Sequence, residues 1–114
     1  MGEEHAWAEG VPAAITVTDA AGTIVAMNAR ARETFAAEGG GALVGASVFA
    51  CHPEPAQSTL RGLYASRAPN QYTIFKGGVR KIIHQLPWQR DGVFAGYVEL
   101  SVVIPEDLPH FDRA

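Results

Sequence analysis

The chain has 114 residues, of which 47% are apolar and 18% charged, which is the composition of a one-domain globular protein and excludes a disordered segment. A net charge of −3 argues against a protein that binds nucleic acid directly, because such binding depends on concentrated Lys and Arg. No stretch is apolar over the roughly 18 residues of a membrane span, and the acidic start lacks the apolar run of a secretory signal.

The chain opens with a predicted arm followed by a hairpin. Residues 1–12 are acidic with one small apolar cluster, which predicts an N-terminal arm or short helix. Alternation at period two predicts strands over residues 13–19 and 23–28. Asp19 and Gly22 stand where a tight turn between these strands needs them.

The middle of the chain changes to helical patterns. Good helix formers over residues 29–38 follow Asn28, a favourable N-cap, and precede three consecutive glycines that end the helix. Residues 42–55 lack a lasting period and predict short helical turns. The strongest helical pattern covers residues 54–67, where apolar side chains form one stripe and prolines occupy the first turn.

Three strands close the sequence. They are predicted over residues 71–75, 80–88 and 93–104, joined by Gly-Gly and Asp-Gly turns. Two hairpins flanking a helical middle predict the α+β class, with one antiparallel sheet and the helices packed on one face. The expected organisation is a domain over residues 13–105 and a C-terminal tail over residues 106–114.

Several short motifs carry a family resemblance. Residues 14–28 read as a strand ending in Asp-x-x-Gly, a second strand, and an Asn at a helix start. Leu43-Val44-Gly45 precedes the next helical turns, and Asp91-Gly92 leads into Gly96-Tyr97-Val98 in the closing hairpin. In these features the chain resembles the PAS domains, small sensory modules whose five-stranded antiparallel sheet and helices surround a pocket.

The resemblance implies a noncatalytic sensory or interaction module that signals through small-molecule binding, dimerisation or both. Residues 102–105 lack the Asp-Ile-Thr type motif that passes the signal onward in many PAS domains, so the usual output route is not expected. A length of 114 residues leaves no room for an effector domain, so the signalling partner is expected to be a protein bound in trans or part of a longer chain. The Cys51-His52-Pro53 segment does not match the Asn-Cys-Arg-Phe-Leu type motif of the flavin-binding subgroup, so flavin is not expected.

A ligand pocket is predicted from strand alternation and from aromatic and histidine side chains. One alternating set on the strand over residues 80–88 is expected to face the helices, and the intervening residues, which include Gln85, to face outward. Tyr64 and Tyr72 offer aromatic rings with polar tips, a common lining of small-molecule sites. Ordinary packing remains the alternative for each side chain. The predicted pocket residues are His84, Ile82, Leu86, Tyr72, Tyr64 and His52.

Two other functions use some of the same residues. A haem-binding gas or redox sensor would use His52 or His84 as the axial ligand. A small enzyme would use Cys51 as nucleophile with a histidine base, although the sequence contains no hydrolase elbow, phosphate-binding loop or zinc-protease motif. Cys51 is the single cysteine, which excludes an intrachain disulfide and predicts a cytoplasmic location.

The last strand predicts an interface. Val98 and Leu100 lie on one of its faces, yet Tyr97 and Val103 on the other face are also apolar, and a half-exposed strand is normally more polar there. Either the segment around Trp7, folding back across the sheet, or a second copy of the chain would cover that face, and the PAS domains that this chain resembles commonly use both together. We therefore expect a homodimer in which Tyr97 and Val103 meet the partner and Trp7 packs at the seam.

Overall fold

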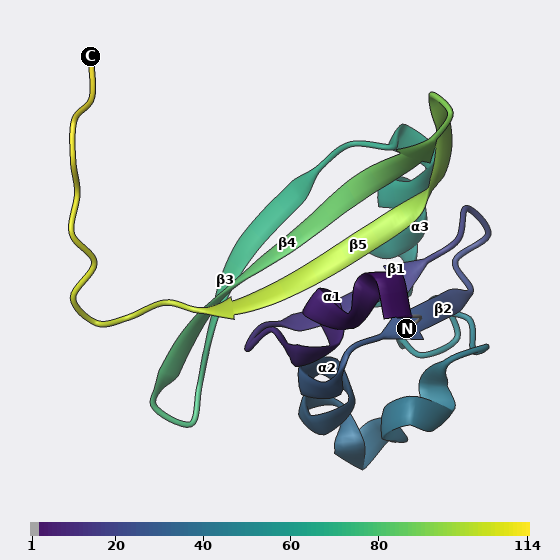
Figure 1. The fold of residues 1–114 in the computed structure, drawn as a ribbon. Helices are drawn as coiled ribbons and strands as arrows, with labels where there is room; N and C mark the ends of the chain where they lie inside the picture. The colour runs from purple at the N-terminus through teal and green to yellow at the C-terminus, as the bar shows by residue number, and fades with distance from the viewer. Residues whose placement is uncertain (1–2) are drawn as a thin grey trace.

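The computed structural model describes residues 3–114 as one five-stranded antiparallel sheet with helices around it (Figure 1). The strands occur in the spatial order β2-β1-β5-β4-β3, so the first hairpin joins the closing strands through the pairing of β1 with β5. The strands are β1 (Ala14–Thr18), β2 (Ile24–Met27), β3 (Asn70–Lys76), β4 (Val79–Arg90) and β5 (Val93–Val103). The α-helices are α1 (Ala6–Gly10), α2 (Ala29–Thr34) and α3 (Ala56–Ser66).

The predicted α+β class is confirmed, and each predicted strand is present. The helix expected over residues 29–38 is shorter, because α2 ends at Thr34 and the chain continues as the 3-10 turn Ala36–Glu38. Gly39 and Gly40 follow with φ of 128° and 54°, values that stop helical continuation. Within residues 3–114, every helix is too short or too polar to cross a membrane.

Tyr97 on β5 marks the inner face of the sheet, the face that carries α3. Its ring centroid lies 4.6 Å from that of Tyr64 on α3. Its hydroxyl lies 2.8 Å from the carbonyl oxygen of Leu63 and 2.7 Å from that of Ala68, to which it donates. Because strand side chains alternate and opposite residues of antiparallel strands share a face, the orientation of Tyr97 determines the orientation of its neighbours.

The predicted orientation of β4 is therefore wrong. The register pairs Gln85 with Glu99 and Ile83 with Ser101, and both residues of β5 alternate in phase with Tyr97. Gln85 and Ile83 thus lie on the inner face. The residues expected there lie on the outer face: Ile82, His84 and Leu86. Both alternating sets of β4 contain apolar side chains. The sequence pattern therefore predicts which residues share a face, but it does not predict which of the two faces meets the helices.

The core consists of two clusters on the inner side of the sheet. One gathers Ala14, Met27 and Ala31 between β1, β2 and α2. The other consists of Phe49, Tyr64 of α3 and Tyr97 of β5, which pack together between the helix and the sheet. Figure 1 shows α3 behind β4 and β5 and α1 in front of β1, so these two helices flank opposite faces of the sheet.

The turn between β1 and β2 explains the Asp-x-x-Gly motif. The Asp19 carboxylate accepts hydrogen bonds from the backbone N–H groups of Ala21 (3.0 Å) and Thr23 (2.9 Å). Gly22 has φ of 86°, and a Cβ there would lie 2.5 Å from the ring of Phe49. Only glycine therefore satisfies both the backbone conformation and the close approach of the second core cluster.

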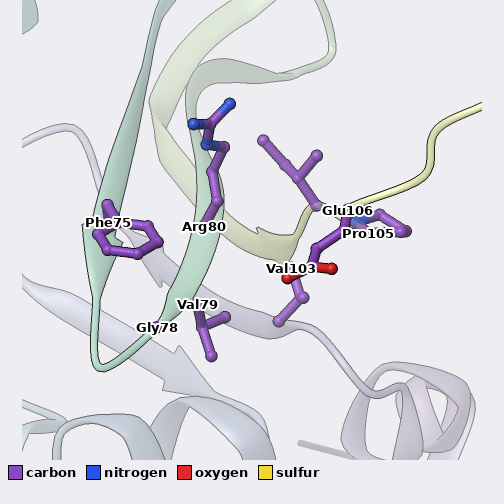
Figure 2. Close-up of a pocket in the computed structure, with 8 residues that line it drawn as sticks. Phe75, Gly78, Val79, Arg80, Val103, Pro105 and Glu106 are labelled. Atoms are coloured by element: carbon purple, nitrogen blue, oxygen red, sulfur yellow. The ribbon is translucent and has the colours of Figure 1, made fainter.

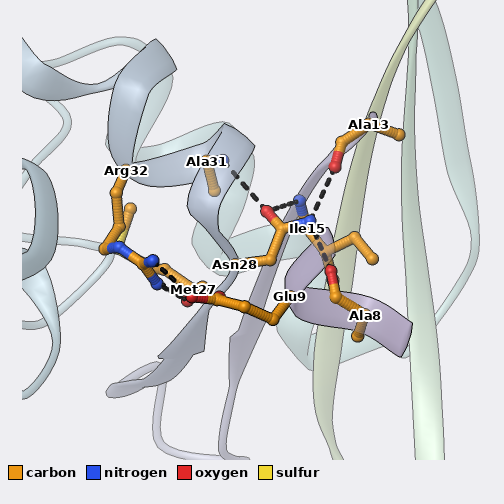
Figure 3. A network of polar contacts seen from close by, with 8 residues as sticks. All are labelled: Ala8, Glu9, Ala13, Ile15, Met27, Asn28, Ala31 and Arg32. Atoms are coloured by element: carbon orange, nitrogen blue, oxygen red, sulfur yellow. Dashed lines mark hydrogen bonds and ion pairs between the residues drawn. The ribbon is translucent and has the colours of Figure 1, made fainter. Parts of the chain in front are cut away.

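Asn28 connects four segments of the N-terminal half and is completely buried (Figure 3). Its Oδ1 accepts from the N–H groups of Ile15 and Ala31, each at 2.9 Å, which caps α2 and secures it to β1. Its Nδ2 donates to the carbonyl oxygens of Ala8 and Ala13, each at 2.8 Å, which secures α1. All of its hydrogen-bonding capacity is thus used within the fold.

Replacing Asn28 should show how much of the fold depends on this side chain. We expect Asn28→Ala to lower the free energy of unfolding by about 3 kcal/mol, because it removes the cap and leaves buried partners without hydrogen bonds. Asn28→Asp keeps the acceptor but loses both donors, so α1 should become more rapidly exchanging in amide hydrogen exchange while α2 stays protected. Equal protection of α1 in the Asp variant and the wild type would contradict the assignment.

Candidate functional site

A cavity of about 590 Å³ lies between α3 and the inner face of the sheet near β3 and β4. Its helix wall includes Leu60 and Leu63, which supply an apolar surface. The chain entering α3 contributes His52. The sheet wall is more polar and includes Asn70, Tyr72 and Gln85. A mostly apolar hollow with a few convergent polar groups is the usual form of a small-molecule site.

A polar row crosses the sheet beside this cavity. The register aligns Asn70 on β3, Gln85 on β4, Glu99 on β5 and Thr16 on β1. Asn70 Nδ2 donates to Gln85 Oε1 at 2.8 Å, and Gln85 Nε2 lies 3.4 Å from Glu99 Oε2, to which it donates. The wall of the cavity is therefore hydrogen-bonded to a carboxyl group in the middle of the sheet.

Glu99 is the acidic group of this row. Burial raises the pKa of its carboxyl, while the hydrogen bond from Gln85 and the nearby His52 act in the opposite direction. Burial also raises the pKa of Tyr72, and the charge of Glu99 adds to that effect. An ionised Glu99 is consequently a costly charge in this position, and a cation in the cavity would stabilise it.

His52 is held in one orientation at the edge of the cavity. Its Nδ1 lies 2.6 Å from the carbonyl oxygen of Val48, which only accepts hydrogen bonds. Nδ1 therefore carries the proton of the neutral ring, and Nε2 is an acceptor or a metal ligand.

The structure brings together only part of the predicted pocket. His52 and Tyr72 line the cavity, and Tyr64 lies in the core beneath α3 with its hydroxyl hydrogen-bonded to Thr18 Oγ1. His84 lies on the outer face with Ile82 and Leu86, as the register requires, so these three residues do not line the cavity.

The predicted interface residues also lie in different places. Tyr97 is 4% exposed and packs against α3, so its predicted role at a dimer interface is wrong. Trp7 and Val103 are exposed. Cys51 is exposed as well and is not among the residues that line the cavity, so a nucleophile there would act outside it.

Sequence reasoning missed Asn70, Gln85 and Glu99 as site residues. Gln85 is predicted to face outward, and Asn70 and Glu99 are not among the predicted site residues. The available signal was that Glu99 is the single charged residue of the otherwise mostly apolar strand β5. The alignment of Glu99 with Gln85 and Asn70 depends on the register, which the sequence pattern does not specify.

A second hollow of about 450 Å³ lies at the far end of the sheet, where the β3–β4 hairpin meets the chain leaving β5 (Figure 2). Phe75 and Val79 face Val103 and Pro105 across it. Its charged lining residues are Arg80 and Glu106, both exposed to solvent. It lacks the convergent hydrogen-bonding groups of the α3 cavity, which is therefore the stronger candidate site.

Comparison with known proteins gives the family. A family model described as PAS fold matches residues 8–106, which is most of the chain. The chain belongs to the PAS family. PAS domains are sensory and signalling modules and in general are not catalytic, which agrees with the function expected from the sequence. Among curated proteins, none matches the chain.

Solved PAS structures share the fold at low sequence identity. The Aer2 receptor from Vibrio cholerae, described as a dual PAS-heme oxygen sensor, has a TM-score of 0.66 at 17% identity, with 86% of this chain and 99% of that chain covered. The PAS domain of BvgS from Bordetella pertussis has a TM-score of 0.63 at 18% identity over 90% and 85% of the two chains. The photoactive yellow protein domain of the sensor histidine kinase Ppr from Rhodospirillum centenum has a TM-score of 0.59 at 20% identity over 89% and 92%.

The raised pKa of the Glu99 carboxyl predicts how the stability of the fold depends on pH. The folded state binds a proton at this carboxyl more tightly than the unfolded chain does, so its ionisation destabilises the fold as pH rises above the ordinary carboxyl range. We expect the free energy of unfolding of the wild type, measured relative to Glu99→Gln in urea, to fall as the pH rises above the ordinary glutamate pKa of about 4.3. Parallel curves for the two proteins would contradict the placement of Glu99. Glu106→Gln, which removes an exposed carboxylate, is the control.

Proposed function

We propose that this PAS domain senses a small molecule held in the cavity between α3 and the sheet. The polar row carries the proposal, because it connects the cavity wall to the central strand β5. Occupancy would change the hydrogen bonds of Gln85 and Glu99, and β5 pairs with both β1 and β4, so the change reaches the outer face through the sheet. The signalling partner is a protein bound in trans or part of a longer chain.

A haem-binding sensor is the second candidate, and one observation favours it. A ring that donates through Nδ1 to a backbone carbonyl and keeps Nε2 free is the common state of a metal-ligating histidine, and His52 has that arrangement at the cavity. His84 lies on the wrong face for this role. The described cavity lining includes neither Lys nor Arg to pair with haem propionates, so a smaller ligand fits this wall better. A Soret band abolished by His52→Ala would favour haem instead.

Filling the cavity tests the proposal. Gly62 lies on α3 at the cavity, and a Cβ built there meets no atom within 4 Å, so Gly62→Leu should fold and occupy the space of a ligand. We expect native mass spectrometry of freshly purified wild type to show a bound small molecule that the Gly62→Leu variant lacks. Ala65→Leu, on an exposed part of the same helix outside the cavity, should retain it. Equal ligand content in the Gly62→Leu variant and the wild type would exclude this cavity.

We also propose a homodimer, formed through the outer face of β4 and β5. That face carries an apolar stripe in which His84 is the one titratable residue among those that the structure describes. Because the stripe contains no Lys, Arg, Asp or Glu within the described chain, two copies would meet there without repulsion between like charges. The stripe consists of Ile82, His84, Leu86, Val98, Leu100 and Val102. Trp7 is 69% exposed on α1, and Figure 1 shows α1 on the side of the sheet opposite to α3, which supports its place at the seam of this interface.

A charge placed in the stripe should separate the two copies. Val102 is 36% exposed, so Val102→Glu is expected to alter the surface while leaving the core intact. We expect light scattering at tens of micromolar to show a dimer for the wild type and a dissociation constant raised by about tenfold or more for this variant, because a carboxylate would be desolvated at the interface. Val93→Glu, at the exposed β4–β5 turn, is the control. A monomeric wild type would refute the dimer.

A further inference from the structure

The hydrogen bonds of the polar row have a defined direction. An ionised Glu99 only accepts, so Gln85 directs Nε2 toward it and Oε1 toward β3. Asn70 must then donate through Nδ2, which leaves its Oδ1 free of protein partners among the described residues. Glu99 Oε1 is likewise without a hydrogen bond in the described part of the chain. The row therefore ends in unused acceptors.

His52 adds an acceptor from the helix side. The donation of Nδ1–H to Val48 leaves Nε2 of the neutral ring to accept a hydrogen bond at the cavity edge. The charged and titratable groups around Glu99 are His52, Tyr64 and Tyr72, of which only His52 becomes positive. Within the described lining of the cavity there is neither Lys nor Arg. An anionic ligand would therefore lie near the Glu99 carboxylate, which is hydrogen-bonded to the wall residue Gln85, and would meet no fixed positive charge in the described lining.

We propose that the cavity takes a small organic ammonium ion, a primary amine on an apolar body, whose N–H groups donate to Asn70 Oδ1 and His52 Nε2 near the Glu99 carboxylate. This inference rests on the proposed ligand-sensing function and names its ligand class. An ammonium group has three donors and no acceptor, which matches the unused acceptors, and its charge offsets that of Glu99.

The remaining walls fit the rest of such a molecule. Leu60 and Leu63 on α3 would cover its apolar body. Tyr72 lines the same cavity and presents an aromatic ring, which attracts cations through its face. A neutral alcohol of the same shape would gain the apolar contacts without the charge interaction, so the charge is expected to decide the preference.

Three probes of nearly equal shape separate charge from size: phenethylamine, 2-phenylethanol and phenylacetate. We expect the full chain, labelled with ¹⁵N and titrated with each probe, to bind the amine at least about tenfold more tightly than the alcohol, and the alcohol more tightly than the acid. The side-chain amide resonances of Asn70 and Gln85 should shift with the amine. These resonances place the probe at the cavity rather than elsewhere on the surface.

Variants assign the preference to the Glu99 carboxylate. Glu99→Gln should reduce amine affinity to that of the alcohol and leave alcohol affinity unchanged, whereas Glu106→Gln should bind like the wild type. Asn70→Asp, which places a carboxylate in the lining of the cavity, should raise amine affinity, and it tests the proposal separately from any effect of Glu99→Gln on folding.

Tight binding of the alcohol or the acid, or an amine preference that survives Glu99→Gln, would overturn the ammonium assignment while leaving the ligand-sensing cavity in place. Failure of all three probes would also overturn the assignment. The sensing function itself is decided separately, by whether a ligand co-purifies with the wild type and is lost on Gly62→Leu.

Discussion

The phenol of Tyr97 determines how the rest of this domain is arranged. Its hydroxyl reaches the backbone carbonyls of Leu63, in the last turn of α3, and of Ala68, just beyond the helix. Its backbone N–H donates to Thr18 Oγ1, and Thr18 in turn bonds to the hydroxyl of Tyr64. One residue of β5 thus joins the long helix to two strands, and its side chain decides which face of the sheet is covered.

The orientation of Tyr97 determines which side chains lie on each face of the sheet. Because strand side chains alternate, the row containing Asn70, Gln85 and Glu99 comes to lie beside the α3 cavity, and the aliphatic side chains of β4 and β5 are left on the outer face. The more polar face is therefore inside, where Gln85 is hydrogen-bonded to both Asn70 and Glu99. The more aliphatic face remains available to another surface, which is the arrangement that the proposed dimer uses.

The proposed ligand cavity and the proposed dimer face are connected through the central strand β5. Glu99 faces the cavity side of β5, and its neighbour Leu100 lies on the outer stripe opposite His84. A shift of β5 that accommodates a ligand at Glu99 would also move Leu100. The proposed sensing in the cavity and the proposed assembly through the outer face therefore share one strand, which would give the domain a physical route from ligand to partner.

The local sequence determined the secondary structure. The turn residues Asp19 and Gly22, the cap Asn28 and the period-two strands act over a few neighbouring positions, so they were readable and predicted the class and the PAS family. The orientation of the sheet was decided only by tertiary structure, because both faces of β4 are apolar enough to be core. Tyr97 resolved this choice through contacts with Leu63 and Ala68, which are 34 and 29 residues away in the sequence, and only that long-range contact placed His84 outside and Glu99 beside the cavity.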